Sequence, residues 1–230
     1  MQSSRKKNVL FLIAAVLCQF ALLFGVFVFY ENLLPGIPLA GRAILLVVCQ
    51  WLFLIVPVVC MLLQKEKPRD IGFSREKLPQ QILVGIGIGV GLCLTFTVLP
   101  MAGLYFMGES SWQEVKGMFS STVYTEGWQF AYEFFYAIVG VGLAEEVFFR
   151  GYVFKKLLDI RDSRVLAIVV SSVLFGLFHA FQGNVLQMGI TAIMGAVFCL
   201  LRERIRYCSL LSLVLAHGIY DALIVVIVSW

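Results

Sequence analysis

The sequence is poor in charge. Only 14% of its 230 residues are Asp, Glu, Lys or Arg, whereas about a quarter of the residues in soluble domains are charged. Apolar residues account for 60% of the chain. This composition excludes an ordinary soluble domain and indicates an integral membrane protein.

Several common sequence signals are also missing. No small-x-small cleavage site follows the first apolar run, which exceeds the roughly 7 to 15 residues of a secretion-signal core, so we expect a retained anchor. The six cysteines show no pairing or metal-ligand spacing and are expected to be small packing residues. A glycine series lacks the G-x-G-x-x-G spacing of a nucleotide loop and instead predicts close helix packing: Gly85, Gly87, Gly89 and Gly91.

The apolar residues are grouped into long windows. A bilayer core about 30 Å thick requires about 20 apolar residues in a helix. Windows of about this length cover residues 8–30, 43–63, 81–107, 130–150, 165–182, 185–201 and 208–229. The connections between them leave no room for a second soluble domain. We therefore expect a single all-α domain over residues 1–230, a polytopic bundle of about seven transmembrane helices.

The basic residues predict the orientation of this bundle. Cytoplasmic loops collect Lys and Arg. With the N-terminus in the cytoplasm, all but two of the 18 basic residues fall on the inner side, the exceptions being Arg42 and Lys116. The net charge of +4 is therefore a topology signal, and no nucleic-acid partner is expected.

A few ionisable residues lie inside the predicted spans, where each costs about 2.5 to 3.5 kcal/mol to insert, and they predict a functional site. They include both histidines of the chain. Three belong to the fourth window, one to the fifth and two to the seventh: Glu145, Glu146 and Arg150, then His179, then His217 and Asp221.

Helical spacing gives these residues different expected roles. Glu146 and Arg150 are four residues apart and can pair on one helix face. Glu145 points about 100° away, which leaves its carboxylate as a candidate general base or acid. The same spacing places Phe175 with His179, and His217 with Asp221.

The ordered motifs Glu-Glu-x-x-x-Arg, Phe-x-x-x-His and His-x-x-x-Asp resemble the CAAX protease and bacteriocin-processing family, the Abi or Rce1-like intramembrane endopeptidases. The resemblance covers roughly residues 130–225, which we expect to be the catalytic core. It implies that Glu145 with His179 activates a water molecule, and that His217 and Asp221 lie on the oxyanion side. Glu146 with Arg150 would orient the fourth helix.

The last motif position differs from the Asn expected in many family members. An ionised Asp221 offers only acceptors and would repel an oxyanion. Either Asp221 is protonated or it orients the His217 ring by accepting from it, and we favour the second.

The resemblance leaves a metal cofactor open. Glu145, His179 and His217, together with Glu146, supply donor types that zinc accepts. The sequence lacks a His-Glu-x-x-His pair, and Glu146 as a ligand would compete with Arg150. We favour a metal-free mechanism.

The expected substrate is a membrane-embedded or lipid-anchored peptide or protein, and the expected location is the cell membrane of a bacterium. One alternative is a proton- or ion-coupled transporter, in which Glu145, His179 and His217 form a relay. Transporters show internal repeats, whereas the chemistry here lies entirely in the last four windows. Another alternative is a catalytically silent scaffold or immunity protein with the same fold.

Overall fold

The computed structural model is helical throughout the part of the chain that it describes, residues 2–33, 36–108, 111–120, 122–182 and 185–230. No strand occurs among these residues, which confirms the all-α class. The long helices are α1 (Gln2–Asn32), α2 (Leu39–Gln64), α3 (Leu78–Cys93), α9 (Arg164–Phe178), α10 (Val185–Arg204) and α11 (Leu210–Ser229).

Shorter elements complete the chain. A π-helical segment, Leu94–Val98, joins α3 to α4 (Leu99–Phe106), and α5 (Trp112–Phe119) lies in the segment predicted as an outer loop. A continuous helical stretch then runs through α6 (Gly127–Phe135), a π-helical segment (Tyr136–Gly142), α7 (Leu143–Glu146), a second π-helical segment (Val147–Val153) and α8 (Phe154–Ile160). We call this stretch, residues 127–160, the catalytic-motif helix.

The described helices include five that are long and apolar enough to cross a membrane. These are residues 5–32, 41–64, 78–106, 185–204 and 210–229. The other two predicted windows also fall in helices, but α9 has only 15 residues and the catalytic-motif helix alternates between α and π geometry. Several long apolar helices of this kind are typical of a multi-pass membrane protein.

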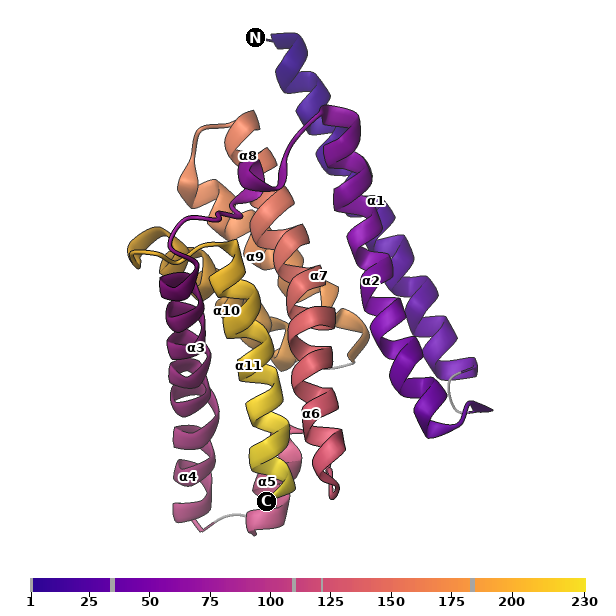
Figure 1. Cartoon of the computed structure of the whole chain (residues 1–230), viewed down its shortest axis with the longest axis vertical. Coiled ribbons are helices and arrows are strands. Elements are labelled where there is room, and N and C mark those ends of the chain that lie inside the picture. Colours follow the sequence, from indigo (N-terminus) through magenta and orange to yellow (C-terminus); the bar gives the residue numbers. More distant parts are fainter. Residues whose placement is uncertain (1, 34–35, 109–110, 121, 183–184) are drawn as a thin grey trace.

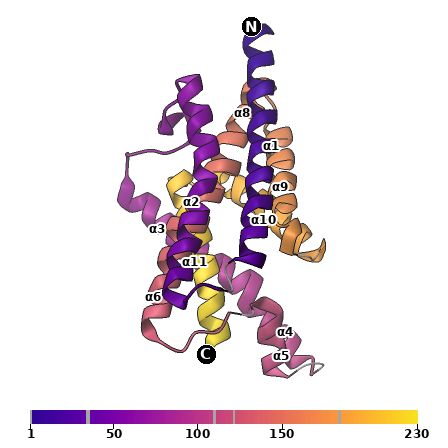
Figure 2. The same ribbon diagram turned by 90° about the vertical axis from the view of Figure 1, so that its right-hand side faces the viewer.

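Figure 1 shows α1 and α2 side by side at one flank of the bundle, with α3 and α11 at the opposite flank and the catalytic-motif helix between them. The N-terminus and the C-terminus lie at opposite ends of the molecule in both views (Figures 1 and 2).

Glycines bring α3 against α11. A Cβ atom on Gly85 would lie 2.8 Å from the Ser212 carbonyl oxygen, and one on Gly89 would lie 2.8 Å from the Ala216 carbonyl oxygen. A Cβ atom added at Gly87 or Gly91 would meet no described residue within 4 Å, apart from its chain neighbours and its own helix backbone. The prediction of close packing is therefore confirmed for one face of α3, and the alternate glycines are not part of that contact.

Glycines also bring α11 against the catalytic-motif helix. A Cβ atom on Gly218 would lie 2.4 Å from Ile138 Cα, and one on Gly142 would lie 2.8 Å from the Val214 carbonyl oxygen. The two backbones can approach this closely only because both positions lack a side chain. This contact carries His217, the neighbour of Gly218, toward the two glutamates.

Candidate functional site

The two glutamates lie in α7, the short α-helical segment between the two π-helical segments. Both are buried, Glu146 completely. A π-helical segment changes the direction of the following side chains and often occurs at functional sites. Glu145 and Glu146 are adjacent in sequence, but their carboxylates lie in two different environments.

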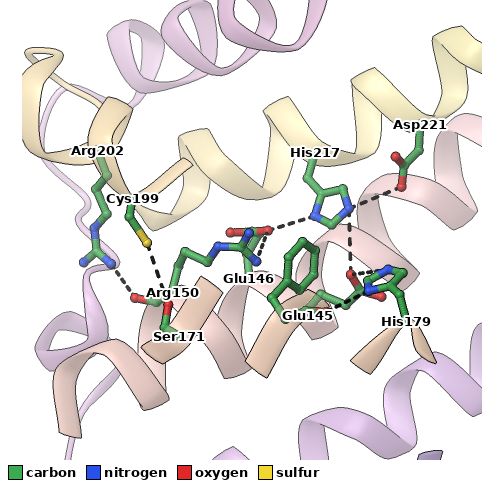
Figure 3. Close-up of polar contacts among 10 residues, drawn as sticks. Glu145, Glu146, Arg150, Ser171, His179, Cys199, Arg202, His217 and Asp221 are labelled. Carbon is green, nitrogen blue, oxygen red and sulfur yellow. Dashed lines mark hydrogen bonds and ion pairs between the residues drawn. The ribbon is translucent and has the colours of Figure 1, made fainter. Parts of the chain in front are cut away.

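Glu146 makes a charged contact on each side. Its Oε1 atom lies 3.1 Å from Arg150 Nη1 and 2.8 Å from His217 Nδ1 (Figure 3). The first contact confirms the predicted ion pair. The second contact, to α11, was not predicted.

Arg150 is buried and stacked as well as paired. Its guanidinium carbon lies 3.9 Å from the centre of the Phe175 ring. Gly195 of α10 allows this placement, because a Cβ atom there would lie 3.1 Å from Arg150 Nη2. The cation thus receives a carboxylate on one side and an aromatic face on the other.

Glu145 has no comparable partner. Its Oε2 atom lies 3.8 Å from His217 Nε2 and 4.0 Å from His179 Nε2, too far for a hydrogen bond. This oxygen is buried and makes no hydrogen bond within the described part of the chain. Figure 3 shows the carboxylate between the two imidazoles. The structure therefore separates Glu145 from the Glu146–Arg150 pair, as the spacing predicts.

The tautomer of His179 follows from its neighbour in the same motif. His179 Nδ1 lies 2.9 Å from the Phe175 carbonyl oxygen. Because a carbonyl oxygen only accepts, Nδ1 carries the proton in the neutral ring and Nε2 has a free lone pair. That lone pair is on the nitrogen nearest Glu145.

His217 lies between two carboxylates. Its Nδ1 atom faces Glu146, and its Nε2 atom lies 3.3 Å from Asp221 Oδ2. Asp221 is on the next turn of α11 and is partly exposed. A ring with protons on both nitrogens satisfies both contacts, since each N–H can donate to a carboxylate oxygen.

A cavity of about 300 Å³ adjoins these groups. Its wall includes all four predicted catalytic residues, Glu145, His179, His217 and Asp221. It continues along the first half of α10 and the middle of α11, where Gln187, Thr191 and Tyr220 line it. It therefore extends from Glu145 to the first turn of α10.

The sequence was compared with known protein families, with curated proteins and with solved structures. The family described as "Type II CAAX prenyl endopeptidase Rce1-like" matches residues 127–223. Residues 127–223 form an Rce1-like domain. No curated protein and no solved structure matches the chain. For this part of the chain, the match to the family implies an intramembrane protease with membrane-protein substrates.

The Rce1-like domain contains every residue that the sequence predicts for the site. The cavity also has polar side chains that were not predicted, and two of them contact each other, namely Gln50 of α2 and Tyr136. Gln50 Nε2 donates to the Tyr136 hydroxyl over 3.2 Å. A polar residue inside the second apolar window was a signal that could have pointed to Gln50.

The side chains of the domain do not fit a metal ion. Among the residues that the structure describes, no group of three or more His, Cys, Asp or Glu side chains has an arrangement that could hold one. Two ligands of a tetrahedral zinc ion lie about 3.4 Å apart, given zinc–ligand bonds of about 2.0 to 2.1 Å. Glu145 lies farther than this from both imidazoles, and Glu146 is already paired. We therefore derive no step through a metal.

Proposed function

We propose that the protein is an intramembrane endopeptidase that uses Glu145 and His179 to activate water against a peptide bond of a membrane-associated protein or peptide. The observation that carries this proposal is Glu145 Oε2, which is buried, makes no hydrogen bond with the described residues, and faces His179 Nε2 across 4.0 Å at a cavity. Groups at this separation can both bind one water molecule between them.

Water activation uses the free lone pair of His179 together with the Glu145 carboxylate. The Phe175 carbonyl oxygen accepts from Nδ1 and keeps Nε2 unprotonated and directed at the water. As the water oxygen attacks the carbonyl carbon, its proton passes to this pair. The same proton is then delivered to the amide nitrogen, so that the C–N bond breaks and the amine leaves.

The carbonyl oxygen of the substrate becomes an oxyanion and requires a donor. In this proposal the donor is the Nε2–H group of His217, which Glu146 fixes from the opposite side of the ring through Nδ1. Without substrate, Asp221 Oδ2 faces this same Nε2–H group and orients the ring, and in this proposal the substrate oxygen replaces Asp221 as the acceptor. Glu146 and Arg150 act as positioning residues.

We further propose that the chain crosses the membrane seven times with its N-terminus in the cytoplasm. The charge distribution supports this orientation, as does the placement of the two termini at opposite ends (Figure 2). In this orientation the start of α10 lies at the non-cytoplasmic side, and Gln187 lines the cavity there. Water and the polar part of the substrate then reach Glu145 from the non-cytoplasmic side.

The test compares the purified protein in detergent with Glu145→Ala and His179→Ala on synthetic membrane peptides, each with and without a chelator. We expect the wild type to cleave and both variants to lose activity by a factor of about 10² to 10⁴, the usual contribution of a general base. Cleavage should be insensitive to the chelator. Equal cleavage by all three proteins would refute the protease assignment, and loss with the chelator would refute the metal-free mechanism.

A further inference from the structure

A second cavity, of about 170 Å³, lies against the same catalytic pair. Three residues line both cavities, namely Gln50, Glu145 and His179. The first cavity extends along α10 and α11, whereas the second is bounded by α1, α2 and the residues that follow α9. Glu145 and His179 therefore lie in the wall between two spaces.

The chemistry of the second cavity is different from that of the first. Apart from the three shared residues, the described residues of its lining are aliphatic and aromatic, and Tyr30 alone among them carries a polar group. Aromatic rings form much of the wall. The ring centres of Phe27 and Phe181 are 5.2 Å apart, and those of Phe53 and Phe178 are 5.3 Å apart. The first cavity instead presents His217 and Asp221.

The size of the second cavity limits what it can hold. An apolar cavity of about 150 Å³ accommodates one benzene molecule. A volume of about 170 Å³ therefore suits a single side chain of the size of Leu or Phe, and it is too small for a long hydrocarbon chain.

We infer that the second cavity is a specificity subsite that binds one bulky apolar side chain of the substrate, at the residue next to the bond that is cut. This inference rests on the proposed protease function. A side chain held among Val26, Phe27 and Phe53 places its own backbone at the shared wall, beside Glu145 and His179. The polar peptide groups on the other side of the bond then lie in the first cavity, which supplies the oxyanion donor.

The subsite can be tested with synthetic peptides that contain one apolar helix and differ at a single central residue: Gly, Ala, Leu, Phe or Trp. The rate at each bond is measured by mass spectrometry with purified protein in detergent. We expect wild-type kcat/KM at the bond next to Leu or Phe to exceed that next to Gly by about 10- to 200-fold, the discrimination that a hydrophobic pocket provides.

Variants change the pocket without touching the catalytic pair. Val26→Phe fills the cavity and should reduce cleavage next to Leu or Phe to about the rate next to Gly. Phe27→Ala enlarges the cavity and should extend the preference to Trp. Val28→Phe is the matched control, because Val28 lies two residues away on α1, is exposed, and lines neither cavity. Should Val26→Phe fail to fold, Phe27→Ala still tests the pocket.

A binding measurement separates this inference from the protease assignment. A peptide with a photoreactive leucine at the central position is irradiated with the Glu145→Gln variant, and the cross-linked residues are mapped. We expect cross-links within residues 23–30 of α1. Cross-links elsewhere only, or equal cleavage of all five peptides, would overturn the subsite while the protease function stands. Cross-links on α1 without cleavage by the wild type would show that the second cavity binds an apolar side chain, and would refute the protease function.

Discussion

The Nδ1 atom of His217 lies 2.8 Å from Glu146 Oε1, and Arg150 Nη1 lies 3.1 Å from the same oxygen. One carboxylate thus joins a cation of its own helix to an imidazole of α11. The ion pair that the spacing predicts as structural therefore also positions a histidine of the proposed oxyanion site (Figure 3).

Replacing Glu146 with Gln should destabilise the protein strongly. The substitution leaves the Arg150 cation buried without its carboxylate, which typically costs about 3 to 5 kcal/mol. Thermal or denaturant unfolding in detergent measures the loss. The double variant Glu146→Gln with Arg150→Met removes both charges and should recover much of the stability, yet it should stay inactive because His217 lacks its carboxylate partner. Additive losses in the double variant would contradict this coupling.

Gly218→Ala should reduce activity on the order of 10²-fold, the cost of misplacing a catalytic group by about 1 Å. The new Cβ atom would lie 2.4 Å from Ile138 Cα, so α11 must move away from the catalytic-motif helix and carry His217 with it. Gly87→Ala is the control, since nothing lies within 4 Å of that position. Peptide cleavage rates report the effect, and similar rates for both variants would disprove this role of Gly218.

Arg202→Met should weaken the end of the bundle that lies opposite the C-terminus. Arg202 donates to the Arg150 carbonyl oxygen at 2.6 Å and to the Ile71 carbonyl oxygen at 3.1 Å, so it connects α10, the catalytic-motif helix and the segment after α2. Each charged hydrogen bond contributes about 1.5 to 3 kcal/mol. We expect lower thermal stability and faster proteolysis within residues 65–77.

Gly72→Ala should reproduce this defect with the arginine intact. Gly72 has φ +110°, and a Cβ atom there would lie 1.8 Å from Arg202 Nη2. Gly108→Ala is the control, since Gly108 also has a positive φ of +74° but has nothing within 4 Å. Equal stability of these two alanine variants would show that the arginine contact contributes little.

A reporter fused after Trp230 should be located outside the cytoplasm. This follows from seven crossings that begin with a cytoplasmic N-terminus, and an alkaline phosphatase fusion in a bacterial host provides the measurement. A fusion within residues 65–77 serves as the control and should report a cytoplasmic location. A cytoplasmic signal from both fusions would refute the number of crossings.

The sequence by itself determines the local features of this protein. Apolar windows predict the helices because a bilayer demands a minimum length of apolar residues, and all predicted windows fall in helical segments. The i, i+4 spacing predicts the Glu146–Arg150 pair and the separation of Glu145 from it, because helix geometry fixes which neighbours share a face. The motif residues also suffice to indicate the family.

Tertiary structure alone decides which groups from different helices meet. The contact of His217 with Glu146, the place of Gln50 at the cavity and the distinction between Gly85 and Gly87 all depend on how α2, α3 and α11 pack around the catalytic-motif helix. The second cavity exists only because α1 and α2 lie against the residues that follow α9. Helical periodicity orients a side chain about its own axis, whereas the distance between axes depends on side chains and glycines contributed by both partners.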